Sequence, residues 1–236
     1  MTAVDPKAVL GELSGGRVLD VATGAGSFVQ FLIDGLRDHD EIIGIDANPE
    51  RAATFAAAFG QRDDVRFVDM DAHHLAFADG SFDTVCVSNS LHHFADPRPV
   101  LAEMLRVLRP GGLVVLNEMY RDGQSETQET HVLLHHWWAA VGRQRGEVHR
   151  ETYGRAEIVA IVETLGLSDL RLVDLADPDE DPHDPETVAE LEAAIDRYVG
   201  LAEGHPELQR RGEDLRVRLR EIGARSATQL VAVGRR

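Results

Sequence analysis

The sequence predicts an α/β protein built on a doubly wound parallel sheet, and three observations support that prediction. Short apolar segments alternate with helical patterns over about 100 residues, which is typical of parallel strands joined by crossover helices. The first apolar segment, residues 17–22, runs directly into the turn Thr23-Gly24-Ala25-Gly26 and then into a helix. Polar residues follow the strand ends, and right-handed crossovers place all of those ends at one edge of the sheet.

The elements of this first half follow from hydrophobic periodicity and from helix breakers. The helices are expected at about residues 27–37, from Asn48-Pro49 onward, and at residues 97–108. The proline and glycines of residues 109–112 are expected to end the last of these helices in a turn. The remaining strands are predicted at residues 41–46, 65–68, 82–88 and 113–118.

Beyond residue 118 the alternation stops and helical patterns dominate. Helices are predicted within residues 119–142 and at residues 155–165, 186–201 and 206–222, with strands at residues 170–175 and 229–233. We therefore expect one domain over residues 1–236 that opens with a short lead-in at residues 1–16. Its parts are a cofactor-binding half (1–119), a helical cap at the substrate (120–166) and a helical insertion before the last strand (176–226).

Composition excludes several classes of protein. The 236 residues are 43% hydrophobic and 28% charged, which suits one ordinary α/β domain. Cys86 is the single cysteine, so an internal disulfide and a thiolate metal cluster are both excluded. The net charge of −17 repels nucleic acids and anionic membranes, so we expect neither as a partner. Without a signal peptide or a membrane-spanning run, the expected location is the cytoplasm, and the oligomeric state stays open, a homodimer included.

The polar groups at the strand ends predict a single ligand cleft. They are Asp20, Asp46, Asp71, Ser88-Asn89 and Glu118. Gly24 and Gly26 let the backbone approach a ligand without a Cβ clash. The spacing of 20 residues from Gly26 to Asp46 also suits an NAD-binding fingerprint, but Val29 stands where its third glycine belongs.

Five segments in this order resemble the motifs of the class I S-adenosylmethionine-dependent methyltransferases: VLDVATGAG, IIGIDANPE, VDMDAHHLAF, FDTVCVSNSLHHF and EMLRVLRPGGLVVL. The chain looks most like the small-molecule branch that includes the ubiquinone and menaquinone C-methyltransferases, over residues 17–119. The resemblance implies a Rossmann-like sheet of seven strands, whose antiparallel last strand is residues 229–233, with helical insertions forming a lid. Ala22 stands where the family usually has glycine, and alanine there is usual in the quinone-methylating branch.

The resemblance implies S-adenosylmethionine as the cofactor and gives its acidic residues separate roles. Asp20 and the adjoining turn would face the methionine end, Asp46 would bind both ribose hydroxyls, and Asp71 would accept from the adenine amino group. NAD binding would leave Asp71 and the LRPGG turn without a role. The complete expected cofactor set is Asp20, Ala22, Thr23, Gly24, Gly26, Asp46, Ala47, Asp71, Ala72, Ser88 and Asn89.

The resemblance implies a methyltransferase that acts on a small-molecule acceptor by direct in-line transfer. That reaction needs alignment of the reacting atoms and exclusion of water, and a base only for an acceptor with a high pKa. The candidate catalytic residues are His92, His93 and Tyr120; the alternative for the histidines is a structural turn. A non-catalytic S-adenosylmethionine-binding module or regulator is the competing function. The sequence leaves open whether carbon, oxygen or nitrogen is methylated.

The segment after residue 118 is rich in histidine and tryptophan. His131 and His135 are four residues apart and would share a helix face, and His149 or Glu147 could complete a zinc site. The simpler interpretation is a cap helix that packs Trp137 and its neighbouring tryptophan on the sheet, so we predict no metal site. The aromatic residues indicate an apolar or aromatic acceptor under the cap.

Overall fold

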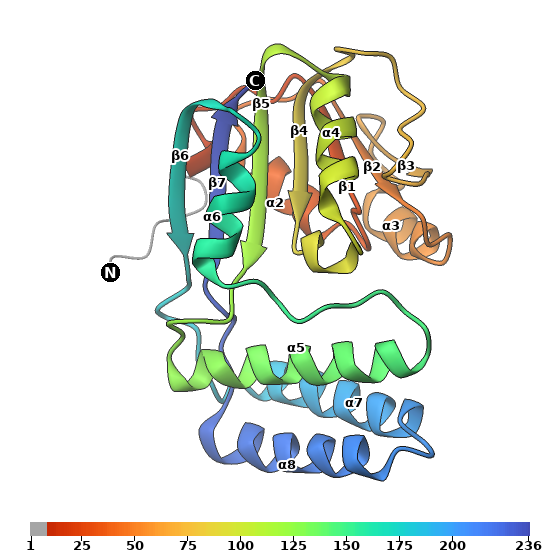
Figure 1. Cartoon of the computed structure of the whole chain (residues 1–236), viewed down its shortest axis with the longest axis vertical. Coiled ribbons are helices and arrows are strands. Elements are labelled where there is room, and N and C mark those ends of the chain that lie inside the picture. The colour runs from red at the N-terminus through yellow and green to blue at the C-terminus, as the bar shows by residue number, and fades with distance from the viewer. Residues whose placement is uncertain (1–8) are drawn as a thin grey trace.

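The computed structural model describes residues 9–236, which form a seven-stranded sheet with helices on both faces (Figure 1). The strand order is β3-β2-β1-β4-β5-β7-β6, and β7 runs antiparallel to both neighbours. The predicted doubly wound α/β fold and its antiparallel last strand are confirmed. The strands are β1 (Arg17–Val21), β2 (Glu41–Asp46), β3 (Val65–Asp69), β4 (Phe82–Ser88), β5 (Leu108–Met119), β6 (Ser168–Leu175) and β7 (Gln229–Arg235).

The central strand β1 pairs in parallel with β2 on one side and with β4 on the other. Val18, Leu19 and Val21 are fully buried in it, because a strand covered on both faces needs apolar side chains pointing both ways. The chain proceeds outward from β1 to β3 and then returns to β4, so the strand order reverses between β1 and β4. At such a reversal the connections diverge and leave a crevice beyond the carboxyl ends of the strands.

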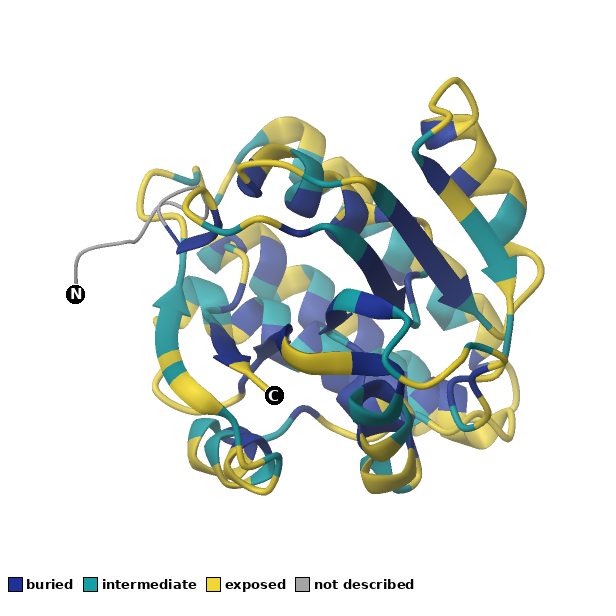
Figure 2. Ribbon diagram, turned by 90° about the horizontal axis from the view of Figure 1, so that it is seen from above, coloured by how far each residue is buried: buried dark blue, intermediate teal, exposed yellow. Residues whose placement is uncertain are grey.

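Helices cover both faces of the sheet. The apolar sides of α2 and α3 pack on one face, and those of α4 and α6 pack on the other. Buried residues therefore concentrate in the strands and on the inner sides of the helices, whose outer sides are exposed (Figure 2). The helices are α2 (Ser27–Gly35), α3 (Arg51–Phe59), the short 3₁₀ helix η1 (Leu91–His93), α4 (Pro97–Val107), α5 (Glu126–Gln144), α6 (Arg155–Glu163), α7 (Pro185–Leu201) and α8 (Pro206–Ile222).

Helices α5, α7 and α8 form a separate layer beyond the carboxyl ends of the parallel strands (Figure 1), which we call the cap. Trp137 lies fully buried at its centre, and its indole N–H donates to the Leu208 carbonyl at 2.8 Å. A Cβ at Gly212 would collide with the Trp137 ring, so α8 approaches α5 closely at that glycine. Arg218 of α8 also donates to Thr130 Oγ1 at 3.1 Å on α5. The two helical segments expected separately thus share one apolar core.

Two predicted boundaries are wrong. Residues 109–112 continue β5 instead of forming a turn, because Gly111 N–H donates to the Arg236 carbonyl and Arg236 N–H donates to the Gly112 carbonyl. Helix α3 starts at Arg51, after a turn in which Asn48 N–H donates to Asp46 Oδ1 at 2.9 Å. Of the predicted lead-in, residues 1–8 lie outside the described residues. Within residues 9–236, no helix combines the length and apolarity needed to cross a bilayer.

Candidate functional site

A cleft of about 570 Å³ opens at the carboxyl ends of β1, β2, β3 and β4. The segment that follows each of these four strands contributes to its wall. All predicted cofactor residues line the cleft except Asp20 and Gly26. The predicted residues in the lining are Ala22, Thr23, Gly24, Asp46, Ala47, Asp71, Ala72, Ser88 and Asn89. The structure therefore brings together, at the strand-order reversal, side chains that are far apart in the sequence.

Asp46 ends β2 and is held in one orientation by two backbone amides. Gly24 N–H donates to Asp46 Oδ2, and Asn48 N–H donates to Asp46 Oδ1, both at 2.9 Å. Each carboxylate oxygen has a second lone pair, so Asp46 can still accept hydrogen bonds from a ligand in the cleft. The hydrogen bond from Gly24 N–H to Asp46 joins the glycine turn after β1 to the end of β2, across the cleft wall.

Asp71 lies just past β3 and is exposed at the rim of the cleft. Its Oδ1 accepts from the backbone N–H of His73 at 2.9 Å and contacts the His73 ring at Nδ1 at 2.8 Å. These hydrogen bonds, the backbone one first, lower the pKa of Asp71 below its usual value. The carboxylate is therefore ionised near neutral pH and ready to accept from a donor on a ligand.

Asp20 is placed differently from the other two acids, because it lies beneath the cleft and not in its lining. It is 1% exposed, and Thr23 Oγ1, which does line the cleft, donates to Asp20 Oδ2 at 2.6 Å. Burial, followed by the nearby charge of Asp46, raises the pKa of Asp20 to about 7. The second oxygen, Oδ1, is buried without a hydrogen-bond partner, so a donor that reached it would relieve a cost of burial.

Positive φ angles mark both turns that face the cleft. Ala22 has φ 56° and Asn89 has φ 45°, conformations that are uncommon for residues with a Cβ. The value at Ala22 explains why glycine suits this position. Asn89 is held in place because its side-chain oxygen accepts from Met119 N–H at 2.8 Å. Backbone conformations of this kind persist where surrounding contacts enforce them, and they cluster at binding sites.

Gly26 is the N-cap residue that precedes α2, with φ 92°, and it does not line the cleft. A Cβ there would collide with the Phe59 ring and would lie 3.0 Å from the Phe55 ring. Glycine is therefore required at this position because a larger residue would disturb the packing of α2 against α3. Gly24, by contrast, lines the cleft, and no atom lies within 4 Å of a Cβ built on it.

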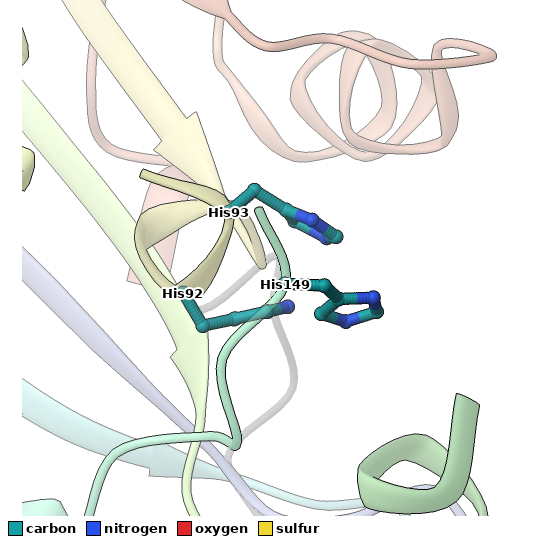
Figure 3. Close-up of side chains that lie close together, drawn as sticks. All are labelled: His92, His93 and His149. Atoms are coloured by element: carbon teal, nitrogen blue, oxygen red, sulfur yellow. The ribbon is translucent and has the colours of Figure 1, made fainter. Parts of the chain in front are cut away.

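His92 and His93 form η1, next to the end of β4. His92 is fully buried, and its Nδ1 lies 2.5 Å from Oε1 of the equally buried Glu118. Oε2 of Glu118 accepts from the backbone N–H groups of Ser90 and Leu91, each at 3.1 Å. His93 lines the cleft, and Figure 3 shows both rings beside His149, which comes from the segment between α5 and α6.

Tyr120, the third candidate catalytic residue, does not line the cleft. It is 6% exposed within the sheet core, and Asp174 of β6 lies near its hydroxyl. Burial and then this carboxylate raise the pKa of Tyr120, so the phenol stays protonated at neutral pH. The contacts of Tyr120 therefore support the side of the sheet that contains β5 and β6. The structure does not place Tyr120 beside His92 and His93.

The histidines of the cap divide into two groups. His131 Nδ1 accepts from Ala227 N–H at 3.0 Å, and His136 Nε2 contacts Thr152 Oγ1 at 2.8 Å, so these two hold the chain in place. The rings of His135 and His149 instead lie beside His92, with ring centroids 4.7 and 5.5 Å away. His131 and His135 are four residues apart on α5, but they therefore do not belong to the same group of histidines.

Known proteins share sequence motifs and the fold with this chain. Residues 19–116 match the family described as a methyltransferase domain. A demethylmenaquinone methyltransferase from Renibacterium salmoninarum is 38% identical over 109 residues, which are 46% of this chain and 44% of that protein. In its motifs and in its fold the chain is similar to the class I S-adenosylmethionine-dependent methyltransferases. It is similar to the quinone methyltransferases among them, as the motifs indicate, although the match spans less than half of that relative's length.

Two further similarities extend over more of this chain. Methyltransferase GfsG of Streptomyces halstedii is 30% identical over 189 residues, which are 75% of this chain and 66% of that protein. The crystal structure of the [4+2]-cyclase SpnF superposes with a TM-score of 0.64 and covers 98% of this chain and 79% of that one. The two sequences are 21% identical, so that likeness shows the shared fold alone.

Several residues that line the cleft were not predicted from the sequence. Arg51 and Met70 each lie within five residues of a strand end. Their closeness to the predicted strand ends was the one feature of the sequence that could have indicated that they line the cleft. His73 was assigned no role in ligand binding, yet it lines the cleft and holds Asp71. The lining also includes the predicted catalytic candidate His93. The lining residues that were not predicted are Ala25, Ser27, Asn48, Arg51, Met70, His73, Ser90 and Phe94.

Proposed function

We propose that this methyltransferase binds S-adenosylmethionine in the cleft between β1 and β4 and transfers its methyl group in line to a small-molecule acceptor. The observation that supports this most strongly is the pair of oriented carboxylates, Asp46 and Asp71, on one cleft whose floor is the glycine turn. When bound, this cofactor supplies a methyl group on a positively charged sulfonium, which is already an activated leaving group.

The residues of the cleft fit the parts of this cofactor. We assign the ribose hydroxyls to Asp46 and the adenine amino group to Asp71, because each donor then meets an oriented carboxylate. We assign the methionine end to the turn of Thr23 and Gly24, above the unpartnered oxygen of Asp20. A cationic amino group near Asp20 would favour its ionised form and so offset the cost of burying that carboxyl.

The acceptor side of the site is proposed at His92 and His93, where the cleft meets the segment that leads out of the cap. His93 lines the cleft, and the segment is tied to η1 because Arg150 N–H donates to the His92 carbonyl at 2.9 Å. A helical layer beyond the strand ends suits a small molecule that is enclosed during transfer, since enclosure excludes water. The name of the demethylmenaquinone methyltransferase favours a quinol-like acceptor, and we expect the enzyme in the cytoplasm.

A second candidate function is cofactor binding without methyl transfer, because the neighbour SpnF is named as a cyclase. A transfer assay separates the two. The protein is incubated with S-adenosylmethionine and a panel of phenolic, quinol and amine acceptors, and formation of S-adenosylhomocysteine and of methylated product is followed by mass spectrometry. Turnover with any acceptor supports the methyltransferase. Cofactor binding without turnover on the whole panel favours the second function, and no binding of either cofactor form refutes both.

A further inference from the structure

Three imidazoles meet beside the cofactor cleft. His92 and His93 come from η1, and His149 comes from the segment between α5 and α6 (Figure 3). One ring nitrogen of each lies within 4.8 Å of the corresponding nitrogens of the other two. The ring centroids of His93 and His149 are 4.3 Å apart, and those of His92 and His93 are 4.4 Å apart. Segments from the two halves of the chain thus place three ligand-type side chains around one point.

The contacts of the His92 ring are those expected of a metal ligand. Its Nδ1 faces the buried Glu118 carboxylate at 2.5 Å, which favours the tautomer with the proton on Nδ1. Nε2 then carries a lone pair, and it is buried without a hydrogen-bond partner in a fully buried side chain. A carboxylate behind an imidazole, with the other nitrogen free, is the usual arrangement around histidine-bound metals.

Two neighbouring rings also lack hydrogen-bond partners. The ring of His149 packs beside those of His92 and His93, with centroids 5.5 and 4.3 Å away. Its Nε2 is buried without a hydrogen-bond partner. His135 of α5 packs against both His92 and His149, and its Nδ1 is equally unpartnered. Such a group of buried, unpartnered nitrogens is costly unless something binds to them.

Backbone contacts hold the cluster in place. Arg150 N–H donates to the His92 carbonyl at 2.9 Å, directly after His149. Arg143, near the end of α5, donates from Nη1 to the His149 carbonyl at 2.8 Å. Glu118 in turn is fixed by the backbone N–H groups of Ser90 and Leu91. The backbone at His92 and His149 is therefore held by contacts that do not involve the rings.

We propose that His92, His93 and His149 bind one divalent transition-metal ion, with zinc as the best match to three imidazole ligands. Nitrogens on one tetrahedral Zn²⁺ lie about 2.0–2.1 Å from the metal and so about 3.3 Å from one another, closer than the 4.8 Å limit seen here. Rotation of the His93 and His149 side chains closes that difference, because neither belongs to the fully buried core. Three histidine ligands leave a fourth position open beside the cleft.

This site does not depend on methyl transfer, and metal binding is measured directly. Protein without a histidine tag is stripped with a chelator, and Zn²⁺ binding is followed by calorimetry and Co²⁺ binding by its visible absorption. We expect one tight site per chain, and His149→Asn should weaken it by at least about tenfold. His183→Asn is the matched control, because His183 is exposed and far from η1 in the sequence, and it should bind like the wild type.

Glu118→Gln tests the positioning role of the carboxylate. The amide can donate to His92 Nδ1, which places the ring proton on Nε2 and removes that ligand, so we expect about 10- to 100-fold weaker Zn²⁺ binding. Folding is checked by circular dichroism, and His149→Asn remains decisive if this buried variant fails to fold. Absence of stoichiometric Zn²⁺ and Co²⁺ binding at micromolar concentrations overturns the proposal, as does wild-type affinity in His149→Asn. S-adenosylhomocysteine binding, measured on the same samples, reports separately on the proposed function.

Discussion

Replacing Asp46 with alanine tests the proposed cofactor site most directly. The carboxylate is held by Gly24 N–H and Asn48 N–H, both at 2.9 Å, so it presents its remaining lone pairs in a fixed orientation. A hydrogen bond to a charged group contributes about 1.5–3 kcal/mol. We therefore expect Asp46→Ala to weaken binding of S-adenosylhomocysteine by that amount, which is about 10- to 150-fold in Kd.

The assay is isothermal titration calorimetry on folded protein, with Asp69→Ala as the control. Asp69 ends the neighbouring strand β3 in register with Asp46, is exposed and lies outside the cleft lining. It therefore reproduces the change in net charge without touching the ligand. Wild-type affinity in Asp46→Ala would refute the ribose assignment. An equal loss in both variants would show that long-range charge, and not a contact in the cleft, controls binding.

Three further predictions concern stability. Asp20 has a pKa of about 7 in the folded protein and near 4 in the unfolded chain, so between these pH values unfolding releases its proton. The free energy of unfolding should therefore fall by up to roughly 4 kcal/mol from pH 4 to 7. Urea titrations of the wild type and of Asp20→Asn measure this difference. Parallel curves for the two proteins would contradict this. Gly26→Ala, at φ 92° against Phe59, should cost about 2–4 kcal/mol in urea unfolding, and a loss below about 1 kcal/mol would count against the packing argument. Gly212→Ala, which meets Trp137, should cost about 1–3 kcal/mol, and unchanged Trp fluorescence in the native state would argue against a displaced ring.

The order and type of the elements could be predicted because they depend on local pattern. Apolar runs such as residues 41–46 are buried on both faces, and their spacing identifies the strands without reference to the rest of the chain. The residues after each strand could be placed at one edge because right-handed crossovers leave no other arrangement. Asp46 and Asp71, which follow two of these strands, both line the cleft.

Other features depend on which segments meet, and local pattern carries no information about that. Residues 109–112 have the composition of a turn, yet they pair with the chain end at Arg236 and continue β5. Gly26 stands in a ligand-binding motif, yet Phe55 and Phe59 of α3 are what require it to be glycine.

The sequence by itself determined the sheet, the glycine turn and the placement of acidic residues at the strand ends, because periodicity and strand ends are properties of contiguous segments. Only the tertiary structure decided that His149 lies beside His92 and His93, that the Glu118 carboxylate contacts Nδ1 of His92, and that Asp20 is buried beneath Thr23. Burial, pKa and ligand geometry arise from neighbours that are distant along the chain, so they emerge only when the chain has folded.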